Sequence, residues 1–519
     1  MRSKSVKNNN VITLSATKND GSNADIQADE HDRLLVNTGH LNLNGFSVSS
    51  SLNTVFQGFH PYGLINNQLY TQLTATGGAV AANTNGCEVN LSITTSVGSY
   101  SVLRANRNIQ YRPGLVNTLT QSAVFNTGVA NSLQFIGVGN NASDIYFCYN
   151  GATFGTRYSS GGLSEVRKLT INVAENTTAT ATITLNSVAY TVSLTNAGGS
   201  TNFTAHQVET GSSFGGIWNI EHIGNVVFFS AKSVGSLNGT YSYSSTGAST
   251  GTFTQLKAGV ALTSNFTAQA DWNGTSIMKD TLDPTKKNMY RIEYVWHGAG
   301  NITYSVYNPD NSTYEVVHTE VFANSATSPS LTQPNMFLQQ GIASLGSTTA
   351  MTLKTSGMYA AVYGNTNVKA PINGITNSKA ISANTETVLL CIKNRNTLNG
   401  FNNQSSMYLE RITVSTDGNR PVIIKIIKNP TTLSANTTTD YTNYTYVDEN
   451  NSLAIYDTTT DTYTGGTILD TIIVGKNLSE YLDYSGEKIE FFQSDIIIFT
   501  ATSTAINTVD IAVVIRDDI

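Results

Sequence analysis

Apolar and polar residues alternate along most of this chain, in short runs that Gly and Asn interrupt. Leu91-Ser-Ile-Thr-Thr-Ser-Val and Leu133-Gln-Phe-Ile-Gly-Val are two of these runs. Successive side chains of a strand point to opposite faces of a sheet, so this alternation is typical of strands that bury one face. Helical periodicity is nearly absent. The pattern therefore predicts an all-β protein.

Residues 166–262 have a pattern of their own. The runs from Leu169 to Val173 and from Thr180 to Val192 predict strands, and a short helix is expected through Phe203 and Glu209. Two further strands follow from Trp218 and meet at a Gly-Asn corner. The segment is predicted to be a compact ββαββ domain.

After this domain, from Met289 onward, the sequence again shows the alternating pattern seen before residue 166. A two-layer core closes only when both sets of strands are present. We therefore predict that residues 48–165 and 263–365 form one discontinuous β-sandwich, and that 166–262 is an insertion into it.

The alternation of apolar and polar residues weakens over residues 366–378, where Asn, Pro and Gly occur, and this predicts a linker. After the linker, residues 379–519 contain about eight strand patterns at regular spacing, for example Val422-Ile-Ile-Lys-Ile-Ile. This count and spacing are typical of one sandwich or jelly roll.

Residues 1–47 contain turn-forming Asn and Gly around the brief apolar runs Val11–Leu14 and Leu34–Val36. We expect an extended docking arm that ends in one short strand. An arm of this kind needs a neighbouring molecule to order it.

Charge changes the functional picture. Only 12% of the 519 residues are Asp, Glu, Lys or Arg, and the net charge is −6, about half the charged share of an ordinary soluble protein. The negative balance disfavours binding to nucleic acid. A surface of amides and hydroxyls suits close contact between copies of a protein, because it avoids repulsion between like charges.

The three cysteines, Cys87, Cys148 and Cys391, lie far apart and match no metal-binding spacing, so we expect buried free thiols. The longest apolar runs are no longer than a strand, and the first residues lack the apolar core of a signal peptide. We expect a soluble chain, made in a cytoplasm, with no membrane insertion.

Several segments give the chain a family resemblance. It resembles virion structural proteins of tailed bacteriophages and large double-stranded DNA viruses from about residue 30 onward. The segments that carry the resemblance are Tyr111-Arg-Pro-Gly, Ala123-Val-Phe, Gly137-Val-Gly, Phe147-Cys-Tyr-Asn-Gly-Ala-Thr-Phe-Gly, Leu282-Asp-Pro-Thr-Lys-Lys-Asn-Met-Tyr, Gly298-Ala-Gly-Asn-Ile-Thr-Tyr-Ser-Val, Tyr456-Asp-Thr-Thr and Thr464-Gly-Gly-Thr. These are turn and packing signatures and not catalytic ones.

The resemblance implies a capsid component, a fibre or another appendage, commonly trimeric, with a C-terminal jelly roll. The first sandwich is also similar to concanavalin-type lectin folds, through the strand with Trp296 and the strands with Tyr304 and His318 that follow it. The predicted fold is thus a lectin-like β-sandwich with an inserted ββαββ domain, followed by a jelly roll. Fold alone does not fix function.

Two groups of residues are candidates for binding. Tyrosines next to Asn or Asp can stack on sugar rings, although tyrosine is also a common strand former; the glycan candidates are Tyr304, Tyr307, Tyr314 and Trp296. Arginines around a tyrosine are typical of interfaces, and could equally pair with Asp144 within one subunit. The interface candidates are Arg104, Arg107, Arg112 and Tyr111.

Catalytic and metal sites have weaker support. Glycoside cleavage needs two carboxyl groups across a groove, and Glu293 with Glu315 or Glu320 would be the pair. Glu315 and Glu320 are five residues apart, which places them on opposite faces of an ideal strand.

Asp271, Asp280 and Asp283 with Asn273 offer oxygen ligands for calcium, but they show neither EF-hand spacing nor a repeated ligand pattern. We predict no catalytic residues, no metal and no cofactor.

The sequence therefore predicts a non-enzymatic virion structural protein that forms a homo-oligomer, with a trimer expected. Its expected partners are other capsid or tail proteins and a host surface glycan. Two alternatives stay open: a tailspike-like glycan hydrolase that uses the paired carboxylates, and a passive minor capsid or cement protein without a host ligand.

Overall fold

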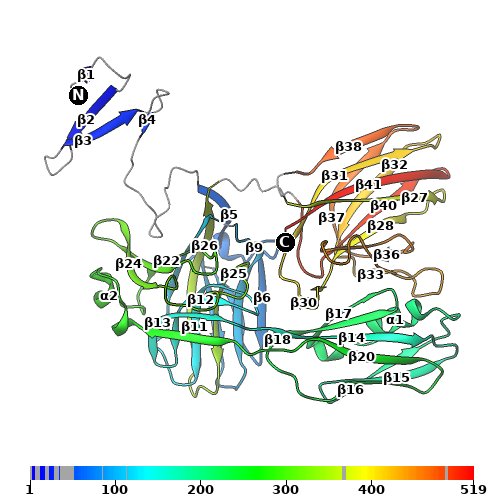
Figure 1. The fold of residues 1–519 in the computed structure, drawn as a ribbon, viewed down its shortest axis with the longest axis horizontal. Helices are drawn as coiled ribbons and strands as arrows, with labels where there is room; N and C mark the ends of the chain where they lie inside the picture. The colour runs from blue at the N-terminus through cyan, green and yellow to red at the C-terminus, as the bar shows by residue number, and fades with distance from the viewer. Residues whose placement is uncertain are drawn as a thin grey trace.

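The protein is all-β and is built from three bodies, as Figure 1 shows. The structure, a computed structural model, describes residues 52–518 except 85, 113, 365–369 and 486–488, together with the backbone of four short strands nearer the N-terminus. The lectin-like sandwich, the insertion and the jelly roll follow the predicted order along the chain. Among the described residues, no helix is long and apolar enough to cross a membrane.

The four N-terminal strands pair with one another in chain order and antiparallel. They are β1 (Ser3–Ser5), β2 (Ile12–Thr17), β3 (Asn23–Ala28) and β4 (Leu34–Leu35). One short strand was predicted in this segment, and four are present; the rest of the predicted docking arm lies outside the described residues.

The lectin-like sandwich consists of two antiparallel sheets whose strands come from both sides of the insertion. The first sheet is ordered β24 (Thr313–Glu320), β23 (Ile302–Asn308), β22 (Asn288–Tyr294), β10 (Val116–Val124), β26 (Met351–Tyr363), β8 (Glu88–Ile93) and β7 (Ala79–Asn83), with β5 (Leu52–Phe59) beside β26. The second is ordered β21 (Thr263–Ala268), β13 (Thr153–Ser160), β12 (Asp144–Asn150), β11 (Ser132–Gly139), β25 (Met336–Ser344), β9 (Tyr100–Ile109) and β6 (Tyr70–Ala75).

The core of this sandwich lies between the two sheets. Leu119 and Tyr290 from the first sheet and Phe147 and Leu338 from the second are all buried in one cluster. The rings of Phe147 and Tyr290 lie 4.9 Å apart. Alternate residues of each strand face this layer, which explains why alternation in the sequence identified the strands.

The insertion is larger than the predicted ββαββ unit. One sheet contains β17 (Trp218–Ile223), β18 (Val226–Val234), β14 (Ser164–Val173) and β20 (Thr250–Lys257), and the other contains β16 (Val188–Leu194), β15 (Ala179–Leu185) and β19 (Ser242–Ser245). The extra strands β19 and β20 come from a Tyr, Ser and Gly run whose composition hid the alternation. Tyr243 and Phe253 in that run pack against the core of the insertion.

The single long helix of the insertion is α1 (Thr201–Thr210). It begins at Ser200, whose hydroxyl accepts a hydrogen bond from the backbone N–H of Phe203 at 3.1 Å, and this cap satisfies one of the free amides of the first turn. Ala205 and Val208 pack into the core between the sheets. His206 and Glu209 of the same helix contact Tyr441 and Lys393 of the jelly roll.

Glu175 joins the end of β14 to the turn between β19 and β20. Its carboxylate is fully buried and accepts hydrogen bonds from Ala248 N (3.1 Å), Ser249 Oγ (2.9 Å) and Ser245 Oγ (3.0 Å). Burial acts to raise the pKa of Glu175, but the hydrogen bonds from Ala248 and Ser249 outweigh it and lower the pKa to about 2. A Cβ atom at Gly247 would lie 2.3 Å from Glu175 Oε1, so the approach requires glycine.

We expect Glu175→Gln to destabilise the insertion at neutral pH and much less in acid. The folded pKa of about 2 lies below the value of about 4.3 for an unfolded glutamate. The stability that this carboxylate contributes is therefore complete above the unfolded pKa and is lost as the pH falls toward 2. Thermal unfolding midpoints of both proteins, measured from neutral pH downward, should converge in acid. A difference that does not change with pH would contradict this account.

The C-terminal body has the strand order of a jelly roll. Its first sheet is ordered β27 (Ile372–Ile381), β41 (Asn507–Asp517), β31 (Met407–Thr416) and β38 (Ser479–Asp483), with β39 (Glu490–Phe491) beside β31. Its second sheet is ordered β34 (Thr445–Tyr446), β35 (Ala454–Asp457), β28 (Thr387–Asn394), β40 (Ile496–Ser503), β32 (Val422–Lys428) and β37 (Thr467–Val474).

The eight main strands of this body are β27, β28, β31, β32, β37, β38, β40 and β41 in chain order. If these strands are numbered 1 to 8, one sheet has the order 1-8-3-6 and the other has the order 2-7-4-5. This is the arrangement that defines a jelly roll. Buried apolar residues from both sheets, such as Ile424, Phe499 and Val513, fill the layer between them.

The jelly roll begins earlier than predicted. Strand β27 already starts at Ile372, inside the segment predicted as a linker, and pairs with β41 along its whole length. Only its apolar residues Ile375 and Ile381 are buried in the core. An edge strand with so few buried side chains shows little alternation, which is why the sequence pattern suggested a linker.

Two cysteines match the prediction and one does not. Cys148 and Cys391 are buried free thiols, whereas Cys87 is exposed. Cys87 lies in the tight connection between β7 and β8 and has a positive φ of 48°. Hairpin connections lie at the surface, so an isolated cysteine in one of them is accessible.

Candidate functional site

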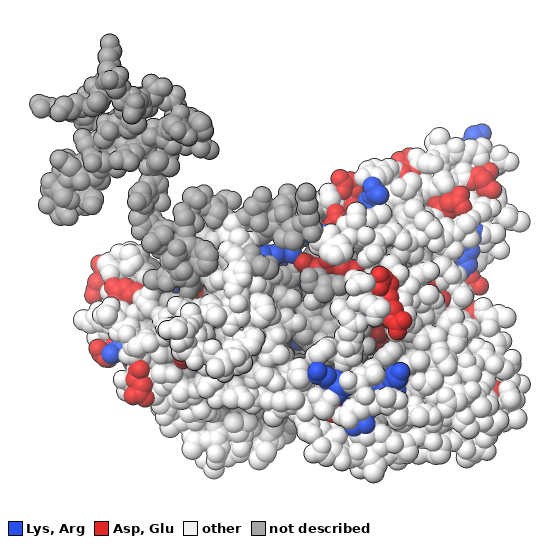
Figure 2. All heavy atoms as spheres, viewed as in Figure 1, with Lys and Arg blue, Asp and Glu red and all other residues white. Residues whose placement is uncertain are grey.

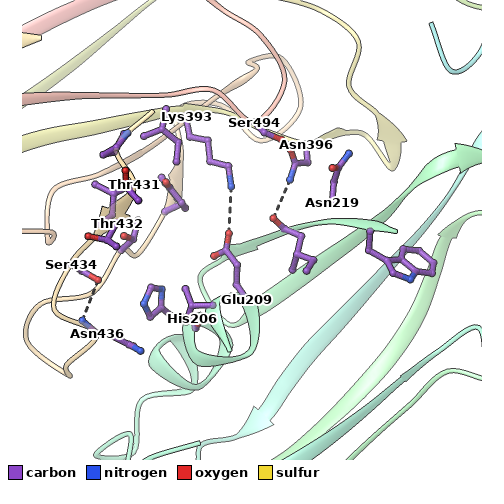
Figure 3. A pocket seen from close by; sticks show the side chains of 18 residues that line it. His206, Glu209, Asn219, Lys393, Asn396, Thr431, Thr432, Ser434, Asn436 and Ser494 are labelled. Carbon is purple, nitrogen blue, oxygen red and sulfur yellow. Dashed lines mark hydrogen bonds and ion pairs between the residues drawn. The ribbon is translucent and has the colours of Figure 1, made fainter. Parts of the chain in front are cut away.

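A cavity of about 660 Å³ lies where the insertion meets the jelly roll. The insertion contributes residues from α1 and β17, and the jelly roll contributes residues from β28 and from the loop after β32. Figure 3 shows Glu209 extending from the helix toward Lys393, while Thr431, Thr432, Ser434 and Asn436 lie along the jelly-roll loop. The lining residues are His206, Glu209, Thr210, Trp218, Asn219, Ile220, Lys393, Asn396, Pro430, Thr431, Thr432, Leu433, Ser434, Asn436, Thr442, Tyr444, Ser494 and Ile496.

Lys393 is the cation of a buried ion cluster on one wall of this cavity. Its Nζ lies 3.5 Å from Glu209 Oε1 and 3.2 Å from Glu221 Oε1. Both the Lys393 and the Glu221 side chains are buried, at 6% and 0% exposure. The two carboxylates belong to the insertion and the lysine belongs to the jelly roll, so the ion pairs join the two bodies.

Backbone groups complete the cluster. The N–H of Asn396 donates to both carboxylate oxygens of Glu221, at 3.2 and 3.1 Å, and its side-chain amide donates to the carbonyl oxygen of Ile220 at 3.1 Å. Buried charges are stable only when their remaining hydrogen-bonding capacity is also satisfied. Glu221 meets this condition through residues of the jelly roll.

The electrostatics of the cluster favour its charged form at Glu209 and Lys393. Burial acts to raise the pKa of Glu209, but Lys393 and His222 lower it to about 2. Burial acts to lower the pKa of Lys393, but Glu221 and Glu209 raise it above its ordinary value. At Glu221, burial raises the pKa more than Lys393 lowers it.

Two histidines lie beside the carboxylates. His222 on β17 contacts Glu209 Oε2 through Nδ1, and its ring lies 5.2 Å from the ring of His206 on α1. His206 is 2% exposed, and burial lowers its pKa to about 4. Within the described part of the chain, neither nitrogen of His206 has a hydrogen-bond partner, and neither does Nε2 of His222.

Apolar contacts surround the polar cluster. Ile223 and Phe228 of the insertion pack against Val388, Cys391 and Ile498 on the outer face of the second jelly-roll sheet. The backbone N–H of Gly224 also donates to the carbonyl oxygen of Tyr444 at 3.3 Å. The insertion is therefore docked on the jelly roll over both an apolar and an ionic contact, and the cavity lies within this contact.

The predicted glycan residues do not form one surface site. Tyr304 is fully buried in the sandwich core, so its predicted role in glycan binding is wrong. Alternation placed it in a strand but could not tell which face it occupies. Trp296 is partly buried against Tyr111 and donates a hydrogen bond from Nε1 to Leu331 O at 2.9 Å. Tyr307 and Tyr314 remain partly exposed, with their rings 5.5 Å apart.

The predicted interface arginines make contacts within the chain. Arg112 is buried and forms a 2.5 Å ion pair with Asp518 at the end of the jelly roll. The guanidinium of Arg104 lies 4.8 Å from the ring centre of Phe337, which packs against Phe492. These contacts link the sandwich to the jelly roll.

Tyr111 and Arg107, the other two interface candidates, and Asp144, the suggested partner within one subunit, also have neighbours within the chain. Asp144 pairs with Arg157 at 2.7 Å, so the arginines of the group do not anchor it. Tyr111 contacts His297 through its hydroxyl, and Arg107 lines a second cavity beside Lys428. Arg112 thus joins the sandwich to the jelly roll of its own chain, and contact of these residues with another subunit stays a prediction.

The carboxylates of the hydrolase alternative lie on two faces of one sheet. Glu293 pairs with Thr303 and faces away from the core, whereas Glu315 and Glu320 pair with Val306 and Ile302 on the core side. A β-bulge in β24 shifts the register between Tyr304 and Ser305. It places Glu315 and Glu320 on one face, which corrects the expectation of opposite faces.

The other polar candidates have local partners. Glu315 accepts hydrogen bonds from Ser276 and from Asn308 (2.9 Å), and these lower its pKa. Asp283 accepts from the N–H of Thr285 at 2.9 Å and closes a turn. Asp271, Asp280 and Asp283, which were considered as calcium ligands, form no such cluster among the described residues, where His206, Glu209 and His222 are the one group of His, Cys, Asp or Glu residues close enough to hold a metal ion.

The sequence analysis did not identify the ion cluster. One signal was available, because His206 and Glu209 are three residues apart in the predicted short helix and therefore share a face. Glu221 and His222 follow in the next strand. Their meeting with Lys393 depends on docking between two bodies, and no local pattern in the sequence encodes it.

Comparisons with known proteins give only distant likenesses. No family model and no curated protein matches the sequence. Similar solved structures include a GH16 protein of the Bacteroides ovatus mixed-linkage glucan locus, with 8% identity over 59% of this chain and 99% of that one and a TM-score of 0.26. A legume lectin-like domain from Entamoeba histolytica has 8% identity over 60% of this chain and 98% of that one, with a TM-score of 0.24.

A third similar structure is a triple jelly roll protein from the turret of an archaeal virus. It has 9% identity over 86% of this chain and 90% of that one, with a TM-score of 0.17. At these scores the likenesses carry no argument about function. The assignment of the jelly roll rests on its own strand order.

Proposed function

We propose that this protein is a non-enzymatic structural component of a virion that assembles with copies of itself, as part of a capsid or tail appendage. The observation that carries the proposal is an uncovered apolar edge of the jelly roll. Jelly rolls are common in viral capsid proteins, but the fold alone does not establish the role. The exposed edge is what an assembling protein would need.

This edge, which we call the β37–β38 edge, is formed by the last strands of both sheets. Ile473 on β37 is 66% exposed and lies directly opposite Ile423 on β32, which is 40% exposed. Among the described residues, β37 pairs only with β32, so its outer backbone groups are open to another strand. The other exposed apolar residues of the edge are Ile468, Leu469, Leu478 and Tyr481.

An edge strand with exposed apolar side chains is a hazard that monomeric proteins normally avoid by charge or covering. Charged residues make up only 12% of this chain, and Figure 2 shows that large parts of the visible surface carry none. A second copy of the chain is the occupant that this proposal assigns to the edge. Burying these side chains between copies would remove the hazard.

The remaining parts of the proposal concern other partners. We assign attachment to other capsid or tail proteins to residues 1–47, and contact with a host surface glycan to the sandwich. For the glycan, the support is the partly exposed pair Tyr307 and Tyr314, over which the guanidinium of Arg291 lies 3.8 Å from the Tyr314 ring centre. Aromatic and arginine side chains of this kind can stack on sugar rings.

Light scattering of the purified protein tests the assembly claim. We expect a homo-oligomer, with three copies as the favoured number, whose mass stays constant as the protein is diluted through the micromolar range. A single chain at every concentration would contradict the proposal. Dissociation on dilution would instead give the affinity of the contact.

A further inference from the structure

The geometry points to a divalent metal site, with Zn²⁺ as the expected ion, formed by His206, Glu209 and His222 at the contact between the insertion and the jelly roll. One ligand atom from each of the three residues lies within 4.8 Å of the other two. This inference does not depend on the proposed function, since the three ligands all belong to the insertion and do not involve assembly with another copy.

The three ligands come from elements that are already fixed. His206 and Glu209 project from one face of α1, and His222 projects from β17. The helix and this strand both pack on the core of the insertion. Zn²⁺ bonds to nitrogen and oxygen ligands are about 2.0–2.2 Å long, so neighbouring ligand atoms lie about 3.3–3.6 Å apart. Small side-chain rotations would bring the three atoms from their present separations to these values.

The histidine nitrogens provide an independent reason to expect a ligand. His206 is buried, yet neither of its ring nitrogens has a hydrogen-bond partner within the described ranges, and Nε2 of His222 is in the same state. A buried polar atom without a partner costs about 1–3 kcal/mol. A metal bound to one ring nitrogen of His206 would supply a missing interaction, and since His206 lines the cavity, its other nitrogen would be left to water there.

The charges near the histidines also suit a cation. Glu209 and Glu221 supply two carboxylates, and Lys393 supplies one ammonium group. Asp457 and Asp440 add negative potential at His206. Lys393 approaches Oε1 of Glu209, whereas Oε2 faces His222. One oxygen of Glu209 can thus pair with the lysine while the other binds a metal.

The chemistry of the ligand set selects the class of metal. Two imidazoles and one carboxylate are typical ligands of Zn²⁺ and other late first-row metals, and calcium and magnesium prefer oxygen ligands alone. Three protein ligands leave a fourth position for water or another group. His206 and Glu209 both line the cavity, so this position would face it.

Metal titration of the full-length protein tests this site. After treatment with a chelator and dialysis, we expect one Zn²⁺ to bind per chain, measured by elemental analysis, and Co²⁺ to give the intense visible absorption of a tetrahedral complex. His206→Ala and Glu209→Gln should lose this binding. The Co²⁺ spectrum of the unmodified protein provides evidence that does not depend on whether the variants fold.

His60→Ala is the matched control. His60 is also fully buried, burial lowers its pKa to about 4, and neither of its nitrogens has a partner among the described residues. His60 lies in the lectin-like sandwich, outside the insertion, so His60→Ala should retain Zn²⁺ binding. The inference would be overturned if the unmodified protein bound no Zn²⁺ or Co²⁺, or if His206→Ala and Glu209→Gln bound the metal as tightly as the unmodified protein.

Discussion

Replacing Lys393 by methionine is expected to lower the free energy of unfolding by about 3–5 kcal/mol, because it leaves the buried Glu221 and the partly buried Glu209 without their cation. Glu221 is fully buried, and Lys393 is the only lysine or arginine that contacts it within the described part of the chain. Methionine keeps a similar length and apolar character, so the change removes the charge with little loss of volume. Urea unfolding followed by circular dichroism would measure the loss.

Two further variants identify the cause of that loss. Lys287→Met removes a surface partner of Glu88, where the lysine side chain is 47% exposed, and should cost less than about 1 kcal/mol. Adding Glu221→Gln to Lys393→Met should recover part of the stability, because one of the unpaired carboxylates is then neutral. If Lys393→Met unfolds like the unmodified protein, the cluster does not hold the insertion on the jelly roll.

The second large effect concerns assembly. Ile473→Lys should weaken self-association by about 2 kcal/mol or more, as expected for a residue at the centre of an interface, which corresponds to about 30-fold in Kd. The reason is that an ammonium group would have to be buried against apolar side chains of the neighbouring copy. Ile473 is 66% exposed in the single chain, so the folded chain itself should tolerate the change. Sedimentation velocity over a dilution series would measure the shift.

Val97→Lys is the control for that variant. Val97 is 75% exposed and lies in the lectin-like sandwich, away from the β37–β38 edge. The Val97→Lys substitution introduces the same charge as Ile473→Lys at an exposed valine and should leave the oligomer unchanged. The edge is not the contact surface if Ile473→Lys and Val97→Lys associate equally well.

The architecture could be predicted from the sequence because it depends on local periodicity. Alternation in β32 and β40 places every second side chain in the jelly-roll core, and the Gly224-Asn225 corner marks the turn between β17 and β18. The pattern failed where few side chains are buried. Strand β27 and the Ser- and Gly-rich strands β19 and β20 pair through their backbones while burying little apolar surface.

The candidate site could not be predicted, because its residues meet only after the insertion and the jelly roll fold and dock. Lys393 and Glu209 are 184 positions apart in the chain. Arg112 and Asp518 are 406 positions apart, so one arginine of the cluster that suggested contact with another subunit pairs with the chain's own C-terminal region. The bulge in β24 shows the same limit at short range, since one extra residue moved Glu315 to the face of Glu320.

Electron microscopy of the purified protein tests the central claim most directly. The account predicts ring-like or elongated particles of several copies, in which the jelly rolls meet through the β37–β38 edge and the lectin-like sandwiches lie outside. A map that shows single chains, or copies joined through the lectin-like sandwich while the β37–β38 edge faces solvent, would contradict it.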